Sequence, residues 1–157
     1  MGERARILIV DDDETIRKVL ATILEENGYD VDTAETGKEA IEKSNTSFYN
    51  LALIDFRLPD MDGTELLTAI RETSPRMVKI IVTGYPSLQN AIEAVNRSAD
   101  AYVVKPVNVD NVLAAIEEHL KKQQEEKEHS QEKVAEFIEV RIQELEKERV
   151  TTPRKSR

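Results

Sequence analysis

The feature that most constrains this sequence is a fivefold alternation between short β-branched apolar runs and segments with the apolar spacing of a helix. Each run holds only four or five residues, which is the length of a buried strand. Three of the runs are apolar throughout, as is typical of a parallel sheet that helices cover on both faces. Right-handed crossovers then give an open, doubly wound sheet, so we predict an α/β fold. The expected strands are residues 7–10, 29–33, 51–54, 78–82 and 101–104.

Capping patterns mark the beginnings of three of the intervening helices. Thr36 stands three residues before Glu39, and Asp62 stands three residues before Glu65, which is the spacing of a capping box. Ser87 precedes another stretch with helical apolar spacing. The side-chain oxygen of such a residue accepts a hydrogen bond from a free N–H group of the first turn. We therefore expect helices to begin after Thr36, Asp62 and Ser87.

Charge and composition exclude several classes of function. The net charge is −9, and residues 1–116 hold 20 acidic against 12 basic side chains. We expect no direct nucleic-acid binding, because phosphate backbones require a basic face. The chain has no Cys and only two His, which excludes disulfides and a multi-histidine zinc site. Its apolar runs are far shorter than the roughly 20 residues that span a bilayer, so we expect no membrane insertion and a cytoplasmic location.

The composition changes after residue 120, so we divide the chain into a domain at 1–120 and a charged helical extension at 121–157. The extension has no Pro or Gly between residues 121 and 148 and is rich in good helix formers, so the last helix can continue through it. A 3-4-3 spacing of apolar residues fits two heptads of a short coiled coil, and hence a homodimer. Polar residues upstream in the same register leave a solvated helix or linker as the other interpretation. The spaced residues are Ala135, Ile138, Ile142 and Leu145.

Polar side chains stand at the ends of four of the five expected strands. Because ligands bind beyond the carboxyl ends of the strands in open parallel sheets, these side chains are expected to lie together at one edge. They supply several carboxylates, one hydroxyl and one ammonium group. The residues are Asp11, Asp12 and Asp13 after the first strand, Asp55 after the third, Thr83 after the fourth and Lys105 after the fifth.

This set of groups limits the chemistry of the edge. Carboxylates within a few ångströms of one another raise each other's pKa unless a cation lies between them. A small number of carboxylate oxygens suits Mg²⁺ better than Zn²⁺. A cation, a hydroxyl and a lysine stabilise the oxygens of a phosphoryl group while a free carboxylate attacks phosphorus. The residues therefore indicate Mg²⁺-dependent phosphoryl transfer, although Asp13 alone also fits the N-cap of the next helix.

At these positions the sequence resembles the CheY-like receiver domain of two-component response regulators. The resemblance covers about residues 5–120, with every motif present and in order. It implies a flavodoxin-like sheet with strand order 2-1-3-4-5. The segments that carry it are Ile7-Leu-Ile-Val-Asp-Asp12, Leu53-Ile-Asp-Phe-Arg-Leu-Pro-Asp-Met-Asp-Gly63, Ile81-Val-Thr-Gly84 and Tyr102-Val-Val-Lys-Pro106.

The resemblance implies a signalling phosphoacceptor rather than an enzyme with a substrate of its own. Asp55 would attack a phosphohistidine of a sensor histidine kinase or phosphotransfer protein and become an aspartyl phosphate. Asp12, Asp55 and the backbone carbonyl of Arg57 would ligate Mg²⁺, and Asp11 would act through a coordinated water. Arg57 and Tyr85 each stand two residues past a motif residue, and our hypothesis is that they control the access of water to the aspartyl phosphate.

Three further residues would respond to the phosphoryl group. Thr83 would donate its hydroxyl to it, and Lys105 would form an ion pair with it. Tyr102 would be an aromatic switch that turns inward as Thr83 moves, and so alter contacts with a downstream protein that the motifs do not identify. An edge residue of an amphipathic strand is the other interpretation of Tyr102. The family usually has a cis peptide bond between Lys105 and Pro106, which proline tolerates.

Two other functions stay open from the sequence alone. Asp11-Asp12-Asp13-Glu14-Thr15 also fits the Asp-x-Asp-x-Thr signature of a haloacid-dehalogenase-type phosphatase, with Asp11 as nucleophile and Asp13 as general acid and base. That interpretation leaves Asp55 unexplained. The second alternative is a non-phosphorylated receiver-like interaction module whose pocket is only structural. A dinucleotide-binding domain is excluded, since no Gly-x-Gly-x-x-Gly follows the first strand.

Overall fold

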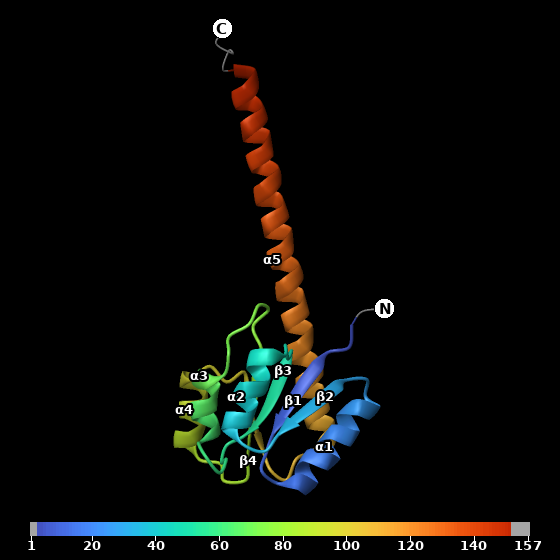
Figure 1. Ribbon diagram of the computed structural model, residues 1–157, viewed down its shortest axis with the longest axis vertical. Coiled ribbons are helices and arrows are strands. Elements are labelled where there is room, and N and C mark those ends of the chain that lie inside the picture. The colour runs from blue at the N-terminus through green and yellow to red at the C-terminus, as the bar shows by residue number, and fades with distance from the viewer. Residues whose placement is uncertain (1–2, 152–157) are drawn as a thin grey trace. The chain divides into compact units, whose positions relative to one another are not determined.

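The computed structural model describes residues 3–151, in which strands and helices alternate along the chain (Figure 1). The strands are β1 (Arg6–Val10), β2 (Asp30–Ala34), β3 (Leu51–Asp55), β4 (Val78–Thr83) and β5 (Ala101–Val104). The helices are α1 (Glu14–Glu26), α2 (Gly37–Thr46), α3 (Gly63–Ala69), α4 (Leu88–Asn96) and α5 (Val109–Thr151). All five predicted strands are present, and the second begins and ends one residue later than predicted.

The strands form one parallel sheet in the order β2-β1-β3-β4-β5. This confirms the predicted doubly wound α/β fold and its strand order. Alternate side chains of β1 enter two separate cores because successive residues of a strand point to opposite faces. Leu8 and Val10 pack with residues of α2, α3 and α4, whereas Ile7 and Ile9 pack with residues of α1 and α5. Helices thus cover both faces and leave the strand ends at the edges.

Side-chain caps fix the beginnings of three helices. Thr36 Oγ1 accepts from Glu39 N–H at 3.0 Å, and Ser87 Oγ accepts from Asn90 N–H at 3.0 Å, as predicted. The Asp13 carboxylate likewise caps α1 by accepting from the Ile16 N–H group. α3 begins directly after Asp62, as predicted, but the predicted side-chain cap is wrong there, because the Asp62 side chain makes no capping hydrogen bond.

The chain divides into two compact units between Gln123 and Gln124. Because α5 begins at Val109 and ends at Thr151, it contributes residues to both units. Gln123 is buried at the end of the first unit, where its side-chain amide donates to the carbonyl oxygens of Asn50 at 2.9 Å and Arg76 at 2.8 Å. From Gln124 to Arg149 every residue is exposed. The final part of the predicted extension, 152–157, lies outside the described residues. Over residues 3–151 no helix has a stretch that is apolar enough to pass through a bilayer.

Candidate functional site

The carboxyl ends of β1, β3, β4 and β5 bring the predicted residues together. Asp11 and Asp12 directly follow β1, and Lys105 directly follows β5. Asp55 and Thr83 are the last residues of β3 and β4 rather than the first residues after them. Both residues belong to the sheet, because Asp55 pairs with Val82 of β4 and Thr83 pairs with Val104 of β5. The site is therefore built at strand ends whose backbone positions the sheet fixes.

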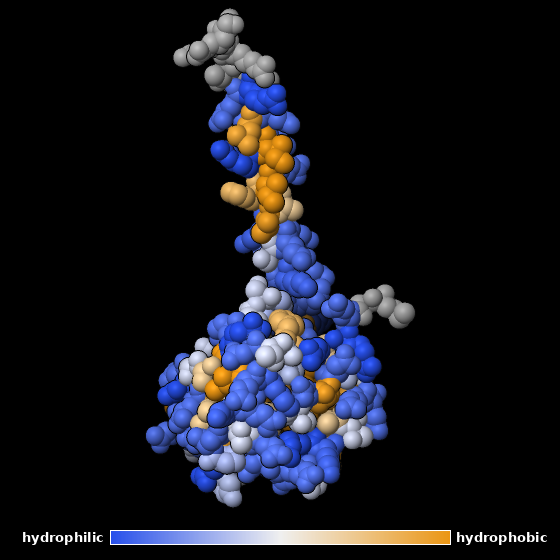
Figure 2. Space-filling model, viewed as in Figure 1, coloured by the Kyte–Doolittle hydropathy of each residue, from blue (hydrophilic) through white to orange (hydrophobic). Residues whose placement is uncertain are grey.

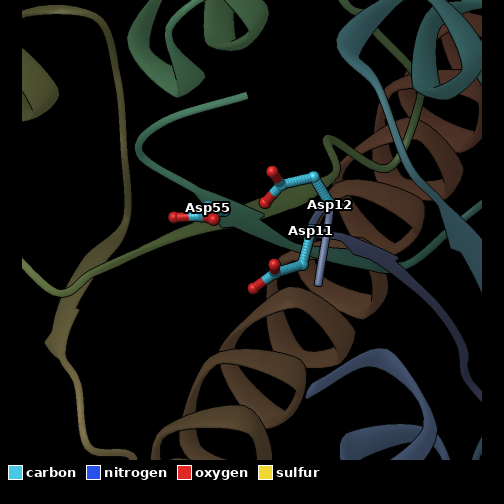
Figure 3. A group of neighbouring side chains, drawn as sticks. All are labelled: Asp11, Asp12 and Asp55. Carbon is cyan, nitrogen blue, oxygen red and sulfur yellow. The ribbon is translucent and has the colours of Figure 1, made fainter. Parts of the chain in front are cut away.

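Three carboxylates meet at this edge of the sheet (Figure 3). Asp11, Asp12 and Asp55 each place one carboxylate oxygen within 4.8 Å of those of the other two. Asp11 and Asp55 are buried, whereas Asp12 is exposed. Asp11 is held in place because its Oδ1 atom accepts a hydrogen bond from Asp13 N–H at 2.9 Å. The predicted convergence of these three carboxylates is confirmed.

Lys105 supplies the positive charge of the site. Its Nζ atom lies 3.1 Å from Asp11 Oδ2 and 3.5 Å from Asp55 Oδ2, so the ammonium group faces both buried carboxylates. Burial works to lower the pKa of Lys105, but the negative charges of Asp11 and Asp55 outweigh it, and the pKa lies above its ordinary value. Lys105 is therefore charged at neutral pH. The bond between Lys105 and Pro106 is cis, as the resemblance implies.

The Asp55 carboxyl lies in an environment that disfavours its charge. Burial, followed by the negative charge of Asp11, raises the pKa of Asp55 to about 6. The charge of Lys105 and the hydrogen bond from Arg57 N–H, at 3.4 Å from Asp55 Oδ1, work in the opposite direction. Lys105 and the Arg57 hydrogen bond thus offset only part of the combined effect of burial and of the Asp11 charge on the pKa of Asp55.

A pocket of about 440 Å³ opens over these groups. Thr83, which is buried, lines the pocket, and Thr83 Oγ1 accepts a hydrogen bond from Tyr85 N–H at 3.0 Å. Because this bond uses only an acceptor lone pair of Oγ1, the hydroxyl can still donate its proton to a group that enters the pocket. The pocket is lined by Asp12, Asp55, Arg57, Thr83, Gly84, Tyr85 and Lys105.

Arg57 and Tyr85 interact directly at the pocket. The Arg57 guanidinium lies over the Tyr85 ring, 4.7 Å from its centroid, which is cation–π geometry. The sequence analysis predicted that each residue lies near the site. It did not predict their contact, because the two residues lie on different loops. The pair joins the loop after β3 to the loop after β4.

The loop after β3 is tied to α2 by Asp60, a contact that sequence reasoning missed. Asp60 Oδ1 and Oδ2 accept hydrogen bonds from the N–H groups of Gly37 and Lys38, each at 2.9 Å. These N–H groups have no partner within the helix, because they belong to its first turn. Residue spacing within one segment cannot predict this contact, because Asp60 lies 23 residues from Gly37.

The donor set fits a hard divalent cation. The three clustered groups are all carboxylates, and such oxygen ligands suit Mg²⁺. Burial and the neighbouring charge of Asp11 both raise the pKa of Asp55, and a cation beside it would favour its charged form. We expect Asp11, Asp12 and Asp55 to hold the ion.

Comparisons with known proteins agree with this geometry. The sequence model of the response regulator receiver domain matches residues 7–117. The transcriptional regulatory protein ZraR of Escherichia coli (strain K12) is 36% identical over 114 residues, which are 73% of this chain and 26% of ZraR. The acid tolerance regulatory protein ActR of Rhizobium meliloti (strain 1021) is 37% identical over 116 residues, or 74% of this chain and 60% of ActR.

The chain belongs to the response regulator receiver domain family. A crystal structure of a CheY-like response regulator receiver domain protein from Methanospirillum hungatei JF-1 is similar with a TM-score of 0.76 and 48% identity, covering 79% of this chain and 99% of that one. The chain spans only about a quarter of the length of ZraR, so the match concerns the receiver part of that protein.

The receiver family match does not favour the phosphatase alternative. In a haloacid-dehalogenase-type site Asp13 would face the substrate as general acid and base. In this structure Asp13 Oδ1 instead accepts from Ile16 N–H at 3.1 Å and caps α1. The predicted interpretation of Asp13 as an N-cap is confirmed.

Proposed function

We propose that this receiver accepts a phosphoryl group on Asp55 in an Mg²⁺-dependent reaction and thereby changes its contacts with other proteins. The observation that supports it most is the meeting of three carboxylates, a buried hydroxyl and a lysine at one pocket. The domain 1–120 would carry this chemistry, and 121–157 would serve as its tail. The protein would act as a signalling phosphoacceptor, with no separate substrate to turn over.

The proposed transfer begins with attack by a carboxylate oxygen of Asp55 on phosphorus. The P–N bond to a donor histidine breaks as the P–O bond forms, and the imidazole nitrogen leaves with the electron pair and takes up a proton. Lys105 lies 3.5 Å from Asp55 Oδ2 and would pair with a phosphoryl oxygen. Thr83 would donate its hydroxyl to another oxygen. Mg²⁺ held by Asp11, Asp12, Asp55 and the Arg57 carbonyl would neutralise charge on the phosphoryl group.

The donor is proposed to be a sensor histidine kinase or a phosphotransfer protein. An apolar groove of about 300 Å³ supports this, because it runs beside the pocket and Lys105 lines both. Its walls come from α1 and from the segment after Lys105, and Val19 on α1 is half exposed there. A helix that carries a phosphohistidine could lie in this groove with its phosphoryl group over Asp55. A cytoplasmic location follows from this class of donor.

The response is proposed to travel through β4 and β5. Thr83 O accepts a hydrogen bond from Lys105 N–H at 2.7 Å, so a shift of Thr83 toward the phosphoryl group moves the end of β5. Tyr102 is the switch residue in this proposal, and among the described residues its buried hydroxyl finds no hydrogen-bond partner. The apolar residues near these elements that are exposed, and so available to a partner, are Leu88, Ile92, Val95, Val104 and Val109.

The test of the proposed function is exposure of the full chain to acetyl phosphate with and without Mg²⁺. We expect intact mass spectrometry to show one added HPO₃ group with Mg²⁺ present and almost none with excess EDTA, because the carboxylates then repel the incoming phosphoryl oxygens. Restoring Mg²⁺ should restore the adduct. An adduct of equal yield in EDTA would contradict the proposed role of the metal.

The contact between Arg57 and Tyr85 predicts how long the phosphoryl group stays. Because the pair lines the pocket, it should shield the aspartyl phosphate from attacking water. We expect Arg57→Ala and Tyr85→Ala each to hasten loss of the adduct by about two- to fivefold, the equivalent of one exposed cation–π contact. The measurement is the decay of the adduct mass after the donor is removed. Arg97→Ala, which removes a partly exposed arginine outside the pocket, should leave the decay unchanged.

A further inference from the structure

An apolar stripe on the tail is left uncovered by the described residues of its own chain. Figure 2 shows it as a run of hydrophobic side chains along α5, and the exposed large apolar residues of this segment are Val134, Phe137, Ile138, Val140, Ile142 and Leu145. Ile138, Ile142 and Leu145 are 51%, 50% and 45% exposed. Isolated apolar residues are normal on a surface, but a continuous apolar stripe marks an interaction site.

The spacing of the stripe specifies the kind of partner. Ala135, Ile138, Ile142 and Leu145, which we call the tail seam, occupy positions a, d, a and d of two heptads. Shifting the register to begin at Val134 would place Arg141 on the seam, which a buried interface disfavours. Ile at position a with Leu at position d, as in the second heptad, favours two parallel strands. The geometry therefore fits a second helix of the same kind.

We propose that residues 131–149 pair with the same residues of a second copy of this chain as a parallel, in-register, two-stranded coiled coil. The flanking charges agree with this orientation. A parallel pair sets position g of one helix beside position e of the next heptad on the other, and so sets Arg141 beside Glu146. An antiparallel pair would set e beside e and g beside g, bringing Glu139 and Glu146 to glutamates and Arg141 to Arg141. In the described part of the chain Arg141 pairs with the exposed Glu144, at 3.0 Å, and such a surface pairing is readily exchanged.

The seam is short, and this sets the strength of the association. Upstream of Ala135 the same register holds Gln131 at d and Glu128 at a, so the apolar part ends there. Two heptads of apolar contact give a reversible dimer whose population rises with protein concentration. The proposal does not depend on phosphorylation of Asp55, because the seam lies outside the receiver unit.

The test is sedimentation velocity of the full chain over a range of concentrations, with two matched variants. Ile142→Asp places a charge on the seam, and Val140→Asp places the same charge two residues away at position f. The two native side chains are 50% and 53% exposed, and both are β-branched. We expect the dissociation constant of the dimer to rise by about tenfold or more in Ile142→Asp, whereas Val140→Asp should change it less than about threefold. Far-UV circular dichroism checks that both variants keep the helix.

Charge reversal tests the orientation. Arg141→Glu and Glu146→Arg should each weaken the dimer, and the double reversal should restore it, because g and e positions again carry opposite charges in a parallel pair. In an antiparallel pair Glu146→Arg alone would instead set an arginine beside a glutamate, and this single variant would strengthen the dimer rather than weaken it. A wild-type chain that stays monomeric at every concentration, equal weakening by the two Asp variants, or a dimer that neither variant affects would each overturn the proposal.

Discussion

Replacing Asp55 by Asn should abolish the phosphoryl adduct while leaving the fold intact. The amide has no carboxylate oxygen to attack phosphorus, and in the described structure Asp55 is the buried carboxylate that lines the pocket beside Lys105 and Thr83. We expect intact mass spectrometry with acetyl phosphate and Mg²⁺ to show one HPO₃ group on the wild type and none on Asp55→Asn. The thermal midpoint should not fall, because the substitution removes a like charge that faces Asp11.

Asp13→Asn is the matched control for this experiment. Asn caps a helix about as well as Asp, so α1 should keep its first turn. Because Asp13 Oδ1 serves as a cap and lies outside the pocket lining, Asp13→Asn should form the adduct at nearly the wild-type level. An adduct that survives in Asp55→Asn and disappears in Asp11→Asn would place the nucleophile after β1 and revive the phosphatase alternative.

The sequence predicted the site because its residues stand at strand ends. The end of an apolar run is visible in the sequence, and in a parallel sheet the ends of neighbouring strands must meet at one edge. Asp11, Asp55 and Lys105 were therefore brought together by topology before any side chain was placed. The strand order itself came from the resemblance to receivers, since apolar runs alone do not say which strands are neighbours.

Contacts between loops were beyond such reasoning. The stacking of Arg57 on Tyr85 and the bonds from Asp60 to the first turn of α2 depend on how loops from different strands approach one another. The spacing of Asp62 and Glu65 predicted a cap that is absent, because a capping pattern only permits the bond. The Asp62 backbone instead pairs with Arg57, and this bridge shapes the loop.

Gly63→Ala should destabilise the receiver and disturb Asp55 at the same time. A Cβ atom on Gly63 would lie 2.4 Å from the Asp55 carbonyl oxygen and 3.1 Å from Ile54 Cγ2, so β3 or α3 would have to move. The two segments cannot easily separate, because Gly63 N–H donates to Phe56 O at 2.6 Å. We expect the free energy of unfolding, measured by urea denaturation, to fall by about 1–3 kcal/mol, the usual cost of overpacking. The yield of the phosphoryl adduct should fall as well.

Gly84→Ala is the matched control for Gly63→Ala, because it also replaces a glycine beside the pocket but creates no close contact. A Cβ atom on Gly84 would meet nothing closer than the Lys105 side chain, at 3.9 Å, which is ordinary van der Waals contact. We expect Gly84→Ala to change the free energy of unfolding by about 0.5 kcal/mol or less and to keep the adduct. Equal losses of stability in the two variants would contradict this explanation. The requirement for glycine at position 63 would then have a cause other than the close approach of α3 to the Asp55 backbone. A large loss confined to Gly63→Ala would show that this approach holds the phosphoacceptor strand in place.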